Sequence, residues 1–241
     1  MDKIRKEIIE QVFKNCKKRN IRAIVLFGSR ARGDHRKNSD YDINVFLKRN
    51  IKKHKIPSYN FDEEIFINYV SPKEFRYQRE NMHSFLYCTF RDGIPIYQEK
   101  RWFDKNKSSV LKLKPSKKTA INYIKRSAEG FFNIKRFNFS NTLLYEDAKV
   151  CSNQLGFGIL MNNQIYPISP HTLKRELINL NKKYKSLAQK IEYLQEIYYN
   201  NRHPKIKNFK SSVKKLEKVS IGYLKKYSLK NYKEVIKFNS L

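Results

Sequence analysis

Cysteine is rare in this sequence and shows no metal-binding spacing. The 241 residues include only Cys16, Cys88 and Cys151, which lie far apart and form no Cys-x-x-Cys pair. Single cysteines spaced in this way indicate neither a disulfide framework nor a zinc site. We therefore expect a protein of an intracellular, reducing compartment.

Long apolar runs are also missing. No stretch reaches the about 18 apolar residues that a membrane-spanning helix needs. The N-terminal residues Met1–Glu7 mix charged and apolar side chains and lack the apolar centre of a secretion signal. The sequence thus predicts a cytoplasmic protein that is neither exported nor inserted in a membrane.

Acidic residues are scarce, since 22 Asp and Glu stand against 52 Lys and Arg, for a net charge of +30. Residues 102–241 hold 29 basic and 9 acidic residues, whereas residues 1–101 hold 23 and 13. The larger surplus on the second part favours phosphate-rich partners such as RNA or nucleotides, and it disfavours polycationic substrates. Biased amino-acid usage, with most lysines solvated, is the alternative explanation.

Residues 1–101 combine short apolar runs with helical periodicity, which predicts an α+β domain. The expected strands are 21–27, 41–47, 61–70 and a short edge strand at 94–97. The expected helices are one that starts near Ile4 and ends near the polar run 16–20, a short one that begins within 29–33, and one over 72–91. The last starts at the cap-and-proline signature Ser71-Pro72-Lys73-Glu74.

Helical periodicity dominates the rest of the chain and predicts an all-α bundle over residues 116–241. The expected helices are 117–136, 141–161, 170–181, 183–199, 207–226 and 231–238. Between the two parts, residues 102–115 contain several lysines and end at Pro115, so we expect a polar linker there. The predicted organisation is therefore two domains, 1–101 and 116–241.

One motif in the first domain points to chemistry. The apolar run Ile24–Phe27 ends at Gly28-Ser29, ten residues follow, and Asp40-x-Asp42 opens the next apolar strand. A glycine lets the backbone approach a phosphate, and a serine at a helix start offers a hydroxyl and backbone N–H groups. Two carboxylates spaced two apart on a strand face the same side and suit hard divalent cations. This spacing predicts a site for a metal-bound triphosphate.

The segments Gly28-Ser29-Arg30-Ala31-Arg32-Gly33 and Ser39-Asp40-Tyr41-Asp42-Ile43 resemble the signature of the minimal nucleotidyltransferases of the DNA polymerase β superfamily. The resemblance covers about residues 1–100. It implies a mixed sheet flanked by helices, two Mg²⁺ ions and the transfer of a nucleoside monophosphate, most often AMP from ATP, with release of pyrophosphate. It also implies that Gly28 and Ser29 form the phosphate loop and that Asp40 and Asp42 are metal ligands.

Two further assignments accompany this motif. Arg30 and Arg32 could neutralise phosphate charge, or they could be solvated on a short surface helix. The family usually places a third acid on the third strand, but the centre of this strand has none. Strand parity puts Asp62, Glu64 and Asn68 on one face, so Glu64 is the favoured third metal ligand and general base, with Asp62 as the alternative.

The helical part resembles, with low specificity, the bundles of HEPN proteins and of the C-terminal domain of kanamycin nucleotidyltransferase. The residues that carry this resemblance lie around Tyr145–Ala148 and Tyr166–Leu173. Glu146 and Asp147 are candidate acceptor-binding residues, although such a pair is more often a solvated helix face. Because the helical part is so basic, a protein or nucleic-acid acceptor is favoured over a polycationic small molecule.

Two functions follow from these observations. The first is a Mg²⁺-dependent nucleotidyltransferase, presumed by resemblance to be an adenylyltransferase, with the helical domain presenting the acceptor. The second is a regulatory module that keeps the fold and binds nucleotide or RNA without turnover, for which the missing central acid of the third strand and the positive charge are the support. The two functions differ in one requirement: the enzyme needs the carboxylate of Glu64 or Asp62 to lie beside those of Asp40 and Asp42.

Overall fold

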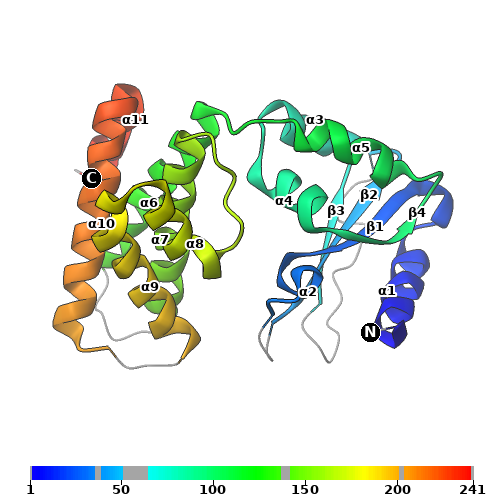
Figure 1. The fold of residues 1–241 in the computed structure, drawn as a ribbon, viewed down its shortest axis with the longest axis horizontal. Helices are drawn as coiled ribbons and strands as arrows, with labels where there is room; N and C mark the ends of the chain where they lie inside the picture. Colours follow the sequence, from blue (N-terminus) through cyan, green and yellow to red (C-terminus); the bar gives the residue numbers. More distant parts are fainter. Residues whose placement is uncertain (1, 36–38, 51–64, 137–141, 201–203, 240–241) are drawn as a thin grey trace. The chain divides into compact units, whose positions relative to one another are not determined.

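The computed structural model describes residues 2–35, 39–50, 65–136, 142–200 and 204–239. The chain forms two compact units, Met1–Lys114 and Pro115–Leu241. The first contains a sheet with flanking helices and the second contains helices in its described residues (Figure 1). The predicted fold class, an α+β region followed by an all-α region, is confirmed.

The sheet of the first unit has the strand order β3-β2-β1-β4. Its strands are β1 (Ile21–Phe27), β2 (Tyr41–Leu47), β3 (Ile65–Val70) and β4 (Ile94–Gln98). β1 is antiparallel to both β2 and β4, whereas β2 and β3 are parallel, so the sheet is mixed. β4 lies at the sheet edge, as expected for a strand that contains Pro95.

Helices cover both faces of this sheet (Figure 1). On one face α1 (Asp2–Asn15) packs Ile8 and Val12 against Ile24 of β1. On the other face lie α3 (Pro72–Glu80), α4 (Ser84–Asp92) and α5 (Trp102–Leu111), which share a second core with Val25. Because successive residues of a strand point to opposite faces, the apolar strand β1 supplies both cores at once.

The single helix predicted over residues 72–91 is two helices, α3 and α4. The predicted cap is confirmed, since the Ser71 side chain accepts a hydrogen bond from the Glu74 backbone N–H. Met82 then takes a positive φ of 51°, which ends the first helix, and His83 Nδ1 accepts from the Phe85 N–H at the start of the second. The break allows α4 to pack Phe90 into the core beside the sheet.

Residues 102–111, expected to belong to a polar linker, form α5 and lie in the first unit. Phe103 and Val110 are fully buried in the core beneath the sheet. They are seven residues apart and therefore share one helix face, while the intervening Lys105 is exposed. The lysines that suggested a linker cover the outer face of an amphipathic helix.

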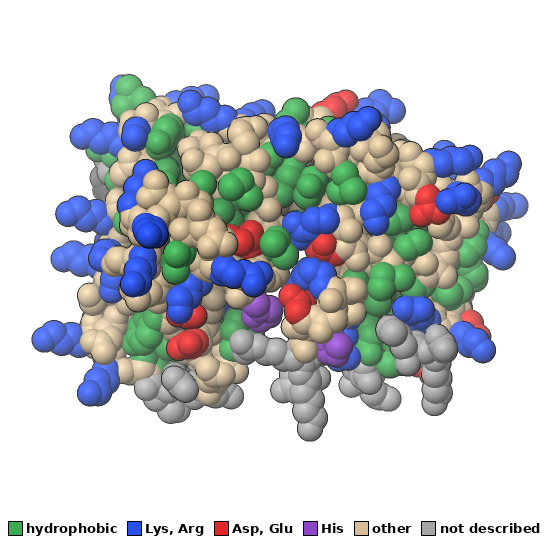
Figure 2. Space-filling view, viewed as in Figure 1, with side chains coloured by type: hydrophobic (Ala, Val, Ile, Leu, Met, Phe, Trp, Pro, Cys, Tyr) green, Lys and Arg blue, Asp and Glu red, His purple; other side chains and the backbone are tan. Residues whose placement is uncertain are grey.

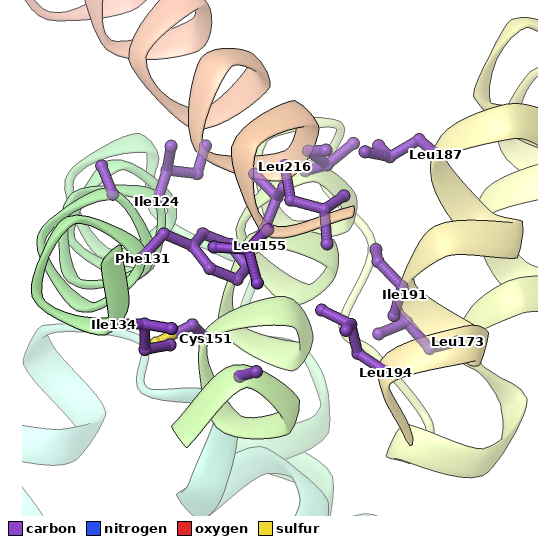
Figure 3. Close-up of a cluster of buried hydrophobic side chains, with 14 of the residues drawn as sticks. Ile124, Phe131, Ile134, Cys151, Leu155, Leu173, Leu187, Ile191, Leu194 and Leu216 are labelled. Carbon is purple, nitrogen blue, oxygen red and sulfur yellow. The ribbon is translucent and has the colours of Figure 1, made fainter. Parts of the chain in front are cut away.

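The second unit contains six α-helices among its described residues, at positions close to those predicted. They are α6 (Lys117–Arg136), α7 (Thr142–Asn162), α8 (Leu173–Leu180), α9 (Lys185–Tyr199), α10 (Ile206–Tyr227) and α11 (Leu229–Asn239). Figure 3 shows their shared core, in which Phe131, Leu155 and Leu216 approach one another from three helices. Lys and Arg side chains project from the surface of both units, and acidic ones are few on the face shown in Figure 2.

Within the described ranges, the structure contains no helix with the length and apolar character needed to cross a membrane.

Candidate active site

The predicted phosphate turn and the second carboxylate are in direct contact. In the register of β1 and β2, Phe27 lies opposite Asp42, and Gly28 follows Phe27 directly. Gly28 has φ +75°, and a Cβ atom built there would lie 2.2 Å from Asp42 Oδ2. Only glycine fits this position, because a side chain would both strain the backbone and overlap the carboxylate.

Asp40 and Asp42 act on each other electrostatically, as expected for two acids on one side of a strand. The pKa of Asp42 is raised to about 7: burial is the largest cause, the negative charge of Asp40 adds to it, and Arg32 opposes the shift. Asp40 is exposed, and neither carboxylate accepts a hydrogen bond from the described residues. The site therefore holds a half-buried acid beside a second acid, an arrangement that a bound cation would stabilise.

These residues fit a divalent metal in their chemistry. Carboxylate oxygens are the hard ligands that Mg²⁺ prefers, and Mg²⁺ often binds through one or two of them together with substrate phosphates. The described part of the chain contains no group of three or more His, Cys, Asp or Glu residues that could hold a metal alone. The donor set on the described residues thus suits a cation that substrate phosphates help to bind.

The third predicted carboxylate, Glu64, and its alternative, Asp62, lie outside the described residues. In the described part of β3, Phe66 lies opposite Asp42 and Asn68 lies opposite Asn44. Phe66 is 62% exposed, which leaves this side of β3 open beside the carboxylates. β3 over Ile65–Val70 supplies no acid to the site.

Arg30 supports the segment that leads to Asp40. Its Nε and Nη2 atoms donate to the Ser39 carbonyl oxygen at 3.1 and 2.8 Å, and Nη1 donates to the Tyr41 hydroxyl at 3.2 Å. The guanidinium also lies 4.2 Å from the centre of the Tyr41 ring. These contacts fix the backbone on both sides of Asp40 from the short helix α2 (Gly28–Arg32).

Arg32 lies between two acids. It pairs with Asp34 at 3.2 Å and with Asp92 at the end of α4 at 3.3 Å, and Asp92 also binds Arg91 through two hydrogen bonds. The same guanidinium lowers the pKa of Asp42. Arg30 and Arg32 are therefore both engaged with protein acceptors, which corrects the expectation that they might be merely solvated.

Ser29 is half-buried, and no described residue hydrogen-bonds its hydroxyl. Its carbonyl oxygen accepts from the N–H groups of Gly33 and Asp34, which closes the turn. The hydroxyl beside Gly28 is thus available to an incoming ligand.

A buried polar chain behind Asp42 was not among the predicted site residues. Asn44, which is 1% exposed, donates to Thr89 Oγ1 at 2.8 Å and accepts from Asn68 Nδ2 at 2.9 Å. Thr89 in turn donates to the Phe85 carbonyl oxygen. This chain joins β2, β3 and α4 two residues beyond Asp42. The signal was present in the sequence, because Asn44 interrupts an apolar strand on the same face as Asp42.

Glu146 and Asp147, the candidate acceptor-binding residues, lie on an exposed face of α7 in the second unit. Glu146 lies 3.9 Å from Lys149, whose side chain is only 13% exposed. Their acceptor role stays a prediction.

Comparison with known proteins identifies a family match for the part of the chain that contains this site. Residues 7–101 match the family model described as "Polymerase beta, Nucleotidyltransferase". No curated protein matches the chain significantly. The matched range contains Gly28, Asp40 and Asp42 and ends before the second unit, so the chain contains a nucleotidyltransferase domain of the polymerase β type. The likeness of residues 116–241 to HEPN or kanamycin-nucleotidyltransferase bundles stays a prediction.

Proposed function

We propose that this protein is a Mg²⁺-dependent nucleotidyltransferase that moves AMP from ATP to a hydroxyl group of an acceptor and releases pyrophosphate. The observation that carries the proposal is the packing of the Asp42 carboxylate against Gly28, beside Asp40, within the matched domain. A glycine turn and two carboxylates at one sheet end suit a substrate whose phosphates and cations must lie together.

In this reaction the acceptor oxygen bonds to the α-phosphorus, the bond from that phosphorus to pyrophosphate breaks, and the hydroxyl proton leaves. We assign the β- and γ-phosphates to the Ser29 hydroxyl and to the backbone N–H groups around Gly28. Asp40 and Asp42 would hold two Mg²⁺ ions, and Glu64 would complete the set and accept the proton. The bound ions would neutralise charge on the phosphate oxygens.

The contacts of the two arginines suggest separate roles within this site. Arg30 would position Asp40, because it binds the backbone and side chain of the residues on either side. Arg32 would meet a phosphate by exchanging its exposed partner Asp34, while Asp92 keeps the guanidinium in place. Both roles keep positive charge beside the carboxylates and the substrate.

For the acceptor we propose a protein or a nucleic acid, bound by the helical unit with Glu146 and Asp147 as candidate contacts. The excess of basic residues in 102–241 supports an anionic partner, since polycationic acceptors would be repelled. We place the protein in the cytoplasm on the sequence features given above.

The experiment is transfer of label from α-labelled ATP, GTP, CTP and UTP in the presence of Mg²⁺, scored together with pyrophosphate release against candidate proteins and RNAs. ATP should be the preferred donor, and Asp40→Asn or Asp42→Asn should each lower transfer by at least about 100-fold. Asp104→Asn, which changes an acid of α5 away from this turn, is the matched control and should transfer normally. Transfer that survives Asp42→Asn would refute the proposed site.

A second candidate is a nucleotide- or RNA-binding regulatory module that keeps the nucleotidyltransferase fold. The observation that favours it is the absence of an acid from the described part of β3 beside Asp42. Glu64→Gln and Asp62→Asn separate the two functions: an enzyme should lose transfer in one of them, with Glu64 the expected one. Nucleotide binding without pyrophosphate release across all acceptors would support the module instead.

A further inference from the structure

A cavity of about 340 Å³ lies in the first unit, away from the candidate active site. It is lined by Arg22 at the start of β1 and by Lys48, directly after the end of β2. Gly28 follows the end of β1 and Asp40 precedes β2, so the antiparallel pairing places the cavity and the carboxylates at opposite ends of the sheet. The volume is within the range of pockets that hold small molecules.

Three arginines of this cavity have no protein acceptor among the described residues. They are Arg22, which is half-buried, and Arg76 and Arg79, which are exposed on α3. Lys48, the fourth cation, pairs with Glu99 at 2.5 Å. Glu99 also interacts electrostatically with Arg22, but no acid is among the residues that line the cavity. A group of guanidinium ions around one cavity favours an anion, and the planar fork of arginine matches phosphate oxygens.

An aromatic wall faces these cations. Trp102 is half-exposed, and its ring centre lies 5.1 Å from that of Phe46 and 5.4 Å from that of Phe75. All three rings line the cavity. The indole is partly exposed and packs against two tilted rings, so it offers a flat surface on which a nucleobase can stack.

Local backbone geometry directs Arg22 toward this wall. The register of β1 with β2 shifts between Ile21 and Ala23, so Arg22 occupies a β-bulge. Ile21 belongs to the core beneath α1, whereas Ala23 belongs to the opposite core, and the bulge turns Arg22 to the cavity side. Bulges that re-aim a side chain in this way are over-represented beside functional sites.

The same bulge is tied to the tryptophan. The Glu99 N–H donates to the Arg22 carbonyl oxygen at 2.7 Å, and the Trp102 N–H donates to the Glu99 carbonyl oxygen at 2.8 Å. Between them Lys100 and Arg101 take positive φ values of 46° and 57°, which non-glycine residues rarely adopt. Such backbone strain persists only where the surrounding structure fixes the conformation. Here the hydrogen bonds of Glu99 fix the turn that places Trp102 at the cavity.

We propose that this cavity is a second ligand site, separate from the carboxylates, that binds a nucleoside phosphate with the base on Trp102 and the phosphate on the three arginines. The ligand is either a free mononucleotide or a nucleotide of an RNA strand. The site goes beyond the transfer reaction proposed above, since it needs neither Asp40 nor Asp42.

The test uses the full chain without Mg²⁺ and follows the fluorescence of Trp102, which is the only tryptophan of the sequence. The probes are AMP, adenosine, inorganic phosphate and a 5′-phosphorylated oligoribonucleotide. AMP should change the emission and bind at least about tenfold more tightly than adenosine or phosphate. Of these three probes, only AMP contacts both the Trp102 ring and the arginines. Tighter binding of the oligoribonucleotide than of AMP would identify RNA as the source, and equal or weaker binding would identify the free nucleotide.

The variants separate this site from its surroundings. Arg76→Gln together with Arg79→Gln should weaken AMP binding at least about tenfold, and both positions are exposed, so folding should be unaffected. Arg19→Gln is the matched control, because Arg19 is an exposed arginine of the same unit that does not line the cavity. Unchanged emission with AMP, or equal affinity of the double variant and the control, would overturn the proposal.

Discussion

The two ends of the sheet in the first unit present different charged groups to a ligand. At one end Asp40 and Asp42 lie beside the Gly28 turn, and the pKa of Asp42 is raised to about 7 by burial and by Asp40. At the other end three arginines surround a cavity without an acceptor among the described residues. The carboxylate end therefore suits a cation and the arginine end suits an anion, although both are built on the same two strands.

The net charge of +30 therefore does not indicate which ion binds at either end of the sheet. Whole-chain charge governs long-range attraction, whereas the local arrangement of a few groups decides which ion is bound. Variants at one end should accordingly leave the other end unchanged.

Gly28→Ala should abolish nucleotide transfer, lowering it by at least about 100-fold, because the new Cβ would overlap Asp42 Oδ2. Gly33→Ala is the matched control: Gly33 also has a positive φ, of +80°, but a Cβ there meets nothing within 4 Å. Transfer assays should show a large loss for Gly28→Ala and a small one for Gly33→Ala. The AMP titration of Trp102 should be the same in both, and equal transfer losses would show that backbone strain alone is responsible.

Asp42 should make the metal-free protein less stable at neutral pH than at acid pH. Its folded pKa, about 7, lies above the ordinary value of 3.8, so its contribution to stability is full below about pH 4 and is lost as the pH rises through 7. Asp42→Asn should remove this contribution and raise the free energy of unfolding at pH 8 in EDTA by about 1–4 kcal/mol.

Denaturant unfolding at pH 5 and pH 8 measures this effect, and added Mg²⁺ provides a second comparison. The wild-type chain should gain stability from Mg²⁺, and Asp42→Asn should gain less. If the variant is no more stable than wild type at pH 8, burial does not raise the pKa of Asp42 as inferred.

Thr89→Val should destabilise the first unit by about 1–3 kcal/mol, because Asn44 would lose its buried acceptor. Thermal unfolding measures the loss. Since Asn44 lies two residues beyond Asp42 and on the same face of β2, transfer should also fall, while AMP binding at Trp102 should persist. A variant with wild-type stability would mean that the chain from Asn68 to Thr89 contributes nothing.

Arg30→Lys should have the smallest effect, a fall in transfer of about tenfold with little change in stability. Lysine keeps the charge but loses the two-pronged bond to Ser39 and the contact with the Tyr41 ring, so Asp40 is held less firmly. Measurement of kcat and KM separates the roles: a fall in kcat fits a positioning residue. A rise in KM for ATP alone would instead indicate a direct phosphate contact.

Much of this fold could be predicted from the sequence because its signals are local. β1 and β2 have the predicted bounds, the Ser71 cap starts α3, and α6 matches the predicted helix at both ends. The predicted proximity of Gly28 to the acids also follows from two strands joined by a short connection. Two stretches were mispredicted: α5 was assigned to a linker because its lysines masked the buried face of Phe103 and Val110, and one helix was expected where α3 and α4 lie.

Side-chain partners between distant segments were beyond prediction. Arg32 and Asp92 are 60 residues apart, and their pairing depends on where α4 ends relative to α2. The cavity gathers Arg22, Arg79 and Trp102 from three elements, and the side on which Arg22 lies depends on a bulge that no residue pattern indicated.

The sequence alone determined the strand, the glycine turn and the Asp-x-Asp pair, since apolar periodicity and backbone freedom act within a few residues. Three features follow from tertiary packing alone. The Asp42 carboxylate lies against Gly28, and Arg30 and Arg32 bind protein acceptors. The far end of the sheet holds a cationic cavity. Strand register and helix packing fix these contacts, and both depend on the whole core at once.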